Sequence, residues 1–169
     1  MAKDVFHSTE RSIETNGISL VYDTFGDPDL APLILIQGLS WQMIMWDDDF
    51  CRELSARGYY VIRFDNRDIG RSTRLASAGI PDIAALLKSL SRGEKVVVPY
   101  LISDMAKDTF GLLDGLGIES AHVAGFSMGG MIGQTMAISR PERVRSLISM
   151  SSSTGNPSLP PQLPKPSSL

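Results

Sequence analysis

The sequence predicts an α/β fold: a mostly parallel sheet, covered by helices on both faces and preceded by an antiparallel hairpin. Three observations support this. Short apolar runs that suit strands alternate with helix-like segments along the chain. These runs are unbroken rather than alternating in polarity, which is typical of parallel strands buried on both faces. The composition, 43% hydrophobic and 21% charged over 169 residues, is that of one globular domain.

The hairpin is expected at the start of the chain. Residues 11–15 and 18–26 form its two strands, joined at Asn16-Gly17, a dipeptide that tolerates the positive φ of a tight turn. The other elements are predicted from apolar runs, from acidic residues near the start and basic residues near the end of a helix, and from glycines that end helices. In chain order we expect a strand at 33–38, a helix at 46–58, a strand at 59–65, a loop at 66–81, an amphipathic helix at 82–93, a helix at 102–118, a strand at 121–126, a helix at 127–140 and a strand at 144–151.

Composition excludes several classes of partner. The net charge of −3, without a basic stripe, indicates neither nucleic acid nor an anionic membrane as a partner. Cys51, the single cysteine, cannot form an internal disulfide, and no Cys/His cluster suggests a metal or cofactor. The N-terminus lacks a signal-peptide core, and Val123–Ile138 is shorter than the ~20 residues of a membrane helix. We therefore expect a soluble, cytoplasmic protein.

One serine stands where a predicted strand meets a predicted helix. Ser127 lies in Gly125-Phe126-Ser127-Met128-Gly129, the G-x-S-x-G pattern of a nucleophile elbow. A sharp turn of this kind forces the serine backbone into a strained conformation with positive φ and lifts its hydroxyl above the sheet. The residues two before and two after must be small, because strand and helix backbones approach closely there. The first N–H groups of the helix are free to stabilise a developing oxyanion.

With these motifs in place, the chain resembles the α/β-hydrolase superfamily, in particular bacterial esterases of the aclacinomycin-methylesterase and pimeloyl-carrier methylesterase type. The resemblance covers most of the chain, including LILIQGLSWQMIMW, YYVIRFDNRDIGRSTR and DTFGLLDGLGIESAHVAGFSMGGMIGQTMA. It implies a serine hydrolase acting on a small-molecule ester or related acyl substrate, without a cofactor or metal. Ser127 is then the nucleophile, and the backbone N–H groups of Leu39 and Met128 form the oxyanion hole. Gln37 stands where the family often has histidine, which need not remove a backbone donor.

Two further segments invite a functional interpretation. Asp65–Ser72 resembles the family's D-x-R-G-x-G-x-S loop, with Asp68 where glycine is usual. We interpret its charges as structural, satisfying backbone groups of the loop. Four apolar residues are candidates for lining an acyl pocket: Trp41, Met43, Met45 and Trp46. For each of them individually, packing in the core or under a cap is the better interpretation.

The chain does not contain a complete Ser-Asp/Glu-His triad in the order that this fold uses. No histidine and only one acid, Glu142, follow Ser127. His122 lies about 16 Å back along the same strand, and nothing directs His7 to the top of the sheet. We therefore expect residues 1–152 to be the N-terminal part of an α/β-hydrolase core without its C-terminal strands. The Pro/Ser-rich residues 153–169 then begin a cap domain.

These expectations leave alternatives open. The first is that the chain is the nucleophile-bearing part of a serine esterase and is inactive alone. The second is a non-catalytic binding module of the same fold. The third is half of a split enzyme that another chain completes. Lactone hydrolysis, carbon–carbon bond hydrolysis and perhydrolysis use the same triad. Dehalogenases and epoxide hydrolases are disfavoured, since they need a carboxylate where Ser127 stands. The last predicted strand, 144–151, would be an exposed edge that invites self-association.

Overall fold

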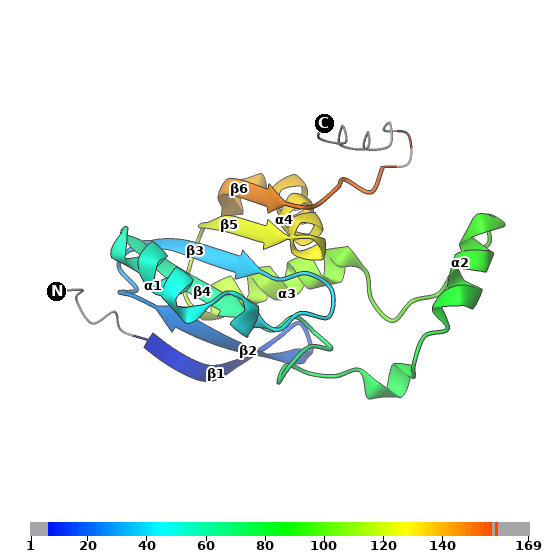
Figure 1. Cartoon of the computed structure of the whole chain (residues 1–169), viewed down its shortest axis with the longest axis horizontal. Coiled ribbons are helices and arrows are strands. Elements are labelled where there is room, and N and C mark those ends of the chain that lie inside the picture. Colours follow the sequence, from blue (N-terminus) through cyan, green and yellow to red (C-terminus); the bar gives the residue numbers. More distant parts are fainter. Residues whose placement is uncertain (1–6, 157, 159–169) are drawn as a thin grey trace, which may run out of the picture.

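A computed structural model describes residues 7–156 and 158 (Figure 1). Its strands are β1 (His7–Thr15), β2 (Ile18–Phe25), β3 (Ala31–Ile36), β4 (Tyr59–Phe64), β5 (Ala121–Phe126) and β6 (Val144–Met150). Its α-helices are α1 (Asp48–Ala56), α2 (Ile83–Ser91), α3 (Ile102–Gly115) and α4 (Met128–Ser139), and three short 3₁₀ turns lie at Met43–Met45, Ala76–Ala78 and Pro141–Arg143. All the predicted strands and helices are confirmed, with boundaries that differ by a few residues.

The strands form one mixed sheet in the order β1-β2-β4-β3-β5-β6. The β1–β2 hairpin is antiparallel and turns at Asn16-Gly17, where both residues have positive φ. β2 joins β4 in antiparallel pairing, and β4, β3, β5 and β6 are parallel to one another. β6 is the outermost strand of the described sheet, as expected. Ile148 on it is 55% exposed, whereas Leu147 is only half-buried against α4.

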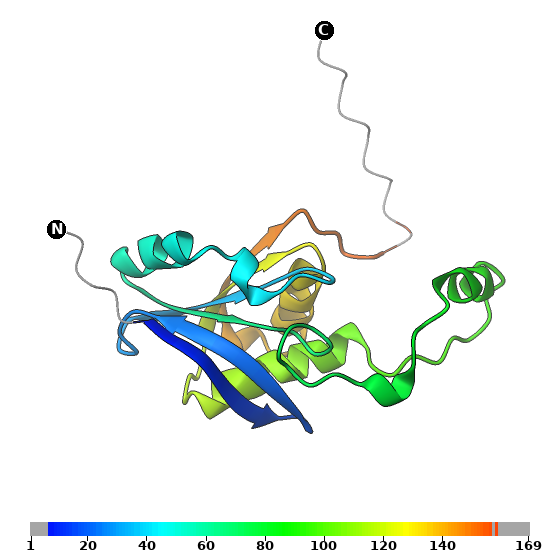
Figure 2. The ribbon, with the colours of Figure 1, turned by 60° about the horizontal axis from the view of Figure 1, so that its bottom comes forward.

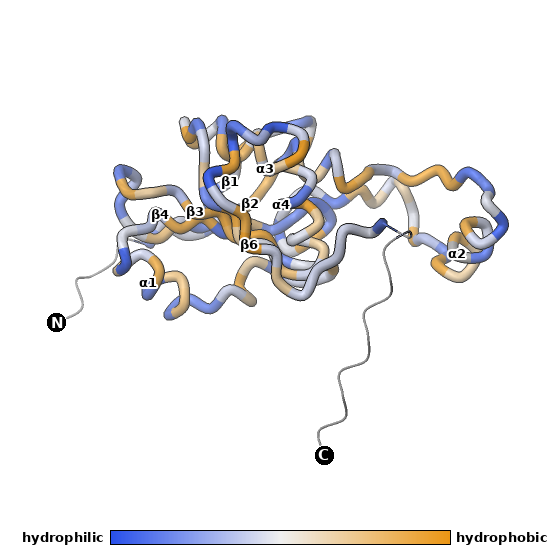
Figure 3. Tube along the Cα trace, turned by 90° about the horizontal axis from the view of Figure 1, so that it is seen from above, coloured by the Kyte–Doolittle hydropathy of each residue, from blue (hydrophilic) through white to orange (hydrophobic). Residues whose placement is uncertain are grey.

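Helices cover both faces of the sheet, as Figure 2 shows. α3 and α4 pack on one face over a large core that includes Ile34, Ile36, Ile62, Leu112 and Ile132. α1 packs on the other face over a smaller cluster that includes Phe25, Leu35 and Cys51. Burying these side chains on both faces is what the unbroken apolar runs predicted. Figure 3 shows hydrophobic residues along the central strands, and also along the segment between α2 and α3.

Two features differ from expectation. β1 begins at His7, four residues before the predicted start, because an irregularity between Ser8 and Arg11 lets the chain continue past Glu10. Glu10 has φ 53° and its N–H donates to the Asp23 carboxylate at 2.8 Å, which replaces the missing ladder bond. In addition, α2 stands away from the body in Figures 1 and 2 rather than covering the sheet. The proposed tail, 153–169, lies mostly outside the described residues.

Candidate active site

Ser127 occupies a sharp turn between the end of β5 and the first residue of α4. Its backbone has φ 53° and ψ −118°, a conformation that L-residues rarely adopt. The Ser127 N–H donates to Met150 O of β6 at 2.8 Å, and Ser127 O accepts from Gly130 N at 2.9 Å. The predicted strand–turn–helix geometry with positive φ is therefore confirmed.

The glycines on either side of Ser127 are required by close backbone contacts. A Cβ atom at Gly125 would overlap the Gly129 carbonyl and lie 2.6 Å from Gly130 N. A Cβ atom at Gly129 would lie 2.7 Å from Ile36 C and 2.8 Å from Gln37 O. The helix therefore crosses the strand ends at a distance that only glycine permits.

The loop after β3 is the second part of the site. A Cβ atom at Gly38 would lie 3.1 Å from Ser127 Cβ, so this loop packs directly against the serine. Gln37 is buried, and its Oε1 accepts from the Gly38 N–H at 3.3 Å. The next N–H, that of Leu39, has no acceptor within residues 7–156 and lies outside any strand. The Met128 N–H begins α4, so no carbonyl of that helix precedes it to accept its hydrogen bond.

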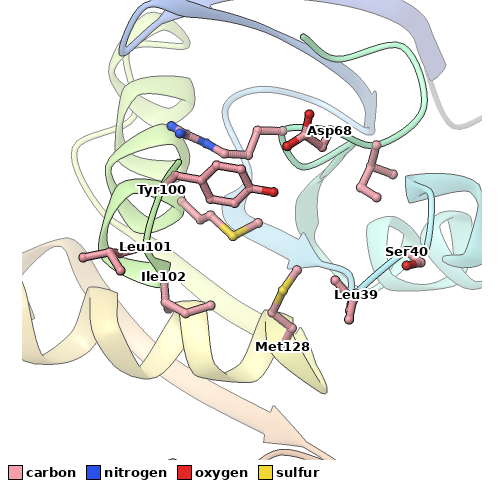
Figure 4. A pocket seen from close by; sticks show the side chains of 10 residues that line it. Leu39, Ser40, Asp68, Tyr100, Leu101, Ile102 and Met128 are labelled. Carbon is pink, nitrogen blue, oxygen red and sulfur yellow. The ribbon is translucent and has the colours of Figure 1, made fainter. Parts of the chain in front are cut away.

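A cavity of about 440 Å³ opens beside this loop (Figure 4). It lies at the carboxyl ends of the parallel strands, where α/β sheets bind ligands. Its walls come from the segments after β3 and β4, the start of α3 and the first residue of α4: Leu39, Ser40, Arg67, Asp68, Ile69, Tyr100, Leu101, Ile102, Met105 and Met128. The cavity is therefore shared by four segments that are far apart in the sequence.

One wall of the cavity carries its charged groups. The Arg67 guanidinium donates two hydrogen bonds to the Asp108 carboxylate, both at 2.6 Å, and both side chains are buried. This hydrogen bonding raises the pKa of Arg67. The guanidinium also lies 4.9 Å from the centre of the Tyr100 ring. Burial, followed by the neighbouring Asp68 carboxylate, raises the pKa of Tyr100 to about 12, so the phenol stays protonated.

Neither histidine of the chain reaches Ser127. His7 packs on the Phe25 ring at 3.9 Å and lies 3.8 Å from both Asp23 and Asp48. His122 Nδ1 lies 2.8 Å from Ser146 Oγ, and its ring meets that of Tyr59 edge-on. Both are held by other partners, and His122 is five residues before Ser127 on β5. A base for the serine is therefore not found among the histidines of this sequence.

Within Asp65–Ser72, the side chains of Asp65 and Ser72 are structural, as interpreted from the sequence. The buried Asp65 carboxylate accepts from Met43 N at 2.8 Å and Arg71 N at 3.1 Å. Ser72 Oγ donates to Asp65 O and accepts from Val21 N. These bonds hold the loop after β4 at the carboxyl edge of the sheet.

The aromatic and methionine candidates for an acyl pocket do not line the cavity of Figure 4. Met43 is buried, Met45 is exposed, and Trp41 stacks on Phe126 with ring centres 5.5 Å apart. The cavity is lined instead by Ile102 and Met105, which lie in the helix predicted at 102–118, and by Tyr100 just before it. The sequence predicted the helix, but only the fold shows that its beginning reaches the site.

No helix in the described part of the chain is long and apolar enough to cross a membrane. Across residues 7–156 and 158, no three side chains of His, Cys, Asp or Glu are grouped so that they could hold a metal ion.

The fold and site together define a class: an α/β protein whose site lies at the carboxyl edge of parallel strands, around a serine in a strained strand–helix turn. A family model described as alpha/beta hydrolase fold matches residues 31–167, and the chain belongs to this family.

Known relatives and solved structures support this assignment to the family. The chain is 36% identical over 140 residues to rhodomycin D methylesterase DnrP of Streptomyces peucetius, covering 83% of this chain and 41% of that protein. It is 31% identical over 144 residues to 3-oxoadipate enol-lactonase 2 of Acinetobacter baylyi, covering 85% and 45%. The crystal structure of an enol-lactonase from Burkholderia xenovorans superposes with a TM-score of 0.66 at 25% identity, covering 84% and 46%. The chain thus spans less than half the length of these relatives.

Proposed function

We propose that this chain supplies the nucleophile and the oxyanion hole of a serine hydrolase that cleaves carboxylic esters. The observation that carries the proposal is the strained turn at Ser127 with the Gly38 loop packed against it. The names of the relatives, a methylesterase and an enol-lactonase, support an ester or lactone substrate. Both substrates present an acyl carbon to a serine hydroxyl.

In this proposal Ser127 Oγ attacks the acyl carbon and the alcohol leaves with a proton. Water then attacks the acyl-enzyme, releases the acid and restores the hydroxyl. The N–H groups of Leu39 and Met128 stabilise the oxyanion that forms in each step, a contribution of about 3 kcal/mol for one such donor in serine proteases. The binding cavity beside them accommodates the substrate.

The base and its carboxylate partner come from polypeptide outside this sequence, since His7 and His122 are held elsewhere. A serine without a base keeps its proton and reacts slowly, because triad members act as a unit. We therefore expect the 169-residue chain to be inactive alone. The same reasoning covers a split enzyme, in which a second chain carries these residues.

A fluorophosphonate probe and p-nitrophenyl butyrate hydrolysis test the proposal. The comparison is between the 169-residue chain and the longest protein that its reading frame encodes, each with Ser127→Ala and the matched control Ser139→Ala at the far end of α4. We expect labelling and turnover in the longer protein, loss of both in Ser127→Ala, and neither in the short chain. Absence of labelling in both proteins would contradict the esterase proposal and favour the binding module. Ser127-dependent turnover by the short chain would show that a base exists within it.

A second candidate property rests on the sheet. β6 is the outermost strand of the described sheet, Ile148 on it is exposed, and unpaired edges pair with other strands. We propose that the chain, taken by itself, associates with further copies through β6.

A further inference from the structure

Asp68 combines three features that set it apart from the other residues of the cavity. By the resemblance to the D-x-R-G-x-G-x-S loop, glycine is usual at this position, and the Asp68 backbone has a positive φ of 66°. Aspartate tolerates that region at some cost in free energy, and glycine at none. The side chain also lines the cavity beside the proposed oxyanion donors. A carboxylate held in this conformation on the wall of the cavity is the starting point of a functional hypothesis.

The charge of Asp68 is not neutralised by the neighbouring arginines. Arg67 is engaged in a two-bond pair with Asp108. The exposed Arg71 pairs with Glu10, and Arg74 donates to Gly70 O at 3.2 Å. Within residues 7–156, Asp68 takes part in no ion pair. Because the Arg67–Asp108 pair has no net charge, the cavity wall carries the negative charge of Asp68.

The Asp68 carboxylate can accept further hydrogen bonds from a ligand besides those that it accepts within the protein. Oδ1 accepts from Leu75 N at 2.6 Å, which closes the loop after β4. An ionised carboxylate has about four acceptor sites, so one backbone bond and the nearby Tyr100 phenol do not exhaust it. Figure 4 shows the Asp68 carboxylate and the Tyr100 hydroxyl on one side of the cavity, with Leu39 and Met128 on the opposite side. A ligand long enough to cross the cavity from the proposed oxyanion donors would therefore reach this carboxylate.

We infer that Asp68 makes this cavity selective for esters that carry a protonated amine, and that it disfavours esters that carry a carboxylate. This inference rests on the proposed esterase function, because it takes the cavity as the substrate site. An ammonium group supplies both the hydrogen-bond donors and the positive charge that the carboxylate requires. A carboxylate-bearing ester would bring a like charge to a partly buried anion, which is repulsive at short range. The apolar walls at Leu101, Ile102 and Met105 accommodate the carbon chain between the two ends.

The test measures binding to the ¹⁵N-labelled 169-residue chain by amide chemical shifts, so that no turnover is needed. The ligands are three methyl esters of similar length: methyl 6-aminohexanoate, methyl heptanoate and monomethyl adipate. We expect the ammonium ester to bind about tenfold more tightly than the neutral ester, and the anionic ester to bind least, with shifts at Leu39, Asp68 and Met128. Added salt should reduce these differences, because a partly exposed charge is screened.

Asp68→Asn separates charge from structure. Asparagine keeps the carbonyl that accepts from Leu75 N–H and tolerates positive φ, so the loop is retained. We expect the ammonium and neutral esters to bind equally well to Asp68→Asn. The matched control, Asp29→Asn, removes an exposed charge before the amino end of β3 and should keep the preference.

Several results would overturn the inference. These are equal binding of the three esters to the unmodified chain, an unchanged preference in Asp68→Asn, or no binding of any ester in the cavity. None of these results depends on Ser127 chemistry. Conversely, charge-dependent binding without probe labelling of Ser127 in the longer protein would refute the proposed function and leave the selectivity of the cavity intact.

Discussion

Gly38 packs against Ser127: a Cβ atom at position 38 would lie 3.1 Å from the Cβ atom of Ser127. The contact joins the loop after β3 to the turn after β5. These segments meet because β3 and β5 are adjacent parallel strands, with Ile36 beside Gly125. Parallel pairing brings both carboxyl ends to one edge of the sheet, so the proposed oxyanion donor and the proposed nucleophile arrive together.

The glycines of the Ser127 turn should be indispensable for folding. Gly125→Ala places a Cβ atom into the backbone of α4, which cannot move without displacing the helix. We expect the free energy of unfolding, measured by urea denaturation, to fall by about 3 kcal/mol or more. Gly115→Ala is the matched control. There the new atom meets only the flexible end of Ile13, and alanine favours a helix by up to about 1 kcal/mol. Equal effects of the two substitutions would contradict the close strand–helix contact.

The Arg67–Asp108 pair should stabilise the cavity wall. Asp108→Asn leaves the buried guanidinium without its anion, and we expect a loss of about 3–5 kcal/mol in the free energy of unfolding. The exposed pair Glu53–Arg57 serves as a control, since Glu53→Gln should cost less than about 1 kcal/mol. A loss as small as that of the control would mean that Asp108 does not hold Arg67 in place.

His7 should make stability depend on pH. Burial lowers the pKa of His7 below 6.5, and this outweighs the opposing effect of Asp48 and Asp23. Below pH 6.5 the unfolded chain therefore binds more protons at this residue than the folded chain does. By linkage, His7 lowers the free energy of unfolding as pH falls. We expect this decrease between about pH 7.5 and about pH 5.5 to be smaller in His7→Gln, measured by urea denaturation.

A matched histidine variant checks the assignment. His122→Gln removes the other histidine, which bonds to Ser146 on the edge strand, and leaves His7 in place. It should keep the pH dependence of the unmodified chain. If His122→Gln reduces the dependence as much as His7→Gln does, the effect does not arise from the burial of His7.

The edge at β6 should determine the oligomeric state of the isolated chain. Ile148→Lys places a charge on the outermost strand of the described sheet, a common means of preventing pairing with another strand. We expect light scattering to show association of the unmodified chain and a shift toward monomer in Ile148→Lys. Ile138→Lys is the control, because Ile138 is 83% exposed on α4 rather than on the edge strand. A monodisperse monomer before any substitution would refute association through β6.

The sequence alone determined the order of elements and the turn at Ser127. Unbroken apolar runs such as LILI and YYVI predicted strands buried on both faces, and the structure places them at the centre of the sheet. The Gly125/Gly129 spacing predicted positive φ at Ser127, since only a tight strand–helix turn needs small residues at both positions. These are local signals, and each is complete within about ten residues.

Tertiary structure alone decided what surrounds the serine. Tyr100, Asp68 and Leu39 share one cavity although they follow or precede different elements, and no local pattern states that they meet. The pairing of Arg67 with Asp108 joins the loop after β4 to α3, and it leaves Asp68 as the charge on the cavity wall. Trp41 and Met45, which the sequence offered as pocket candidates although packing suited them better, do not line this cavity: Trp41 stacks on Phe126 and Met45 is exposed. Composition and spacing describe single elements, whereas a cavity depends on distances between them.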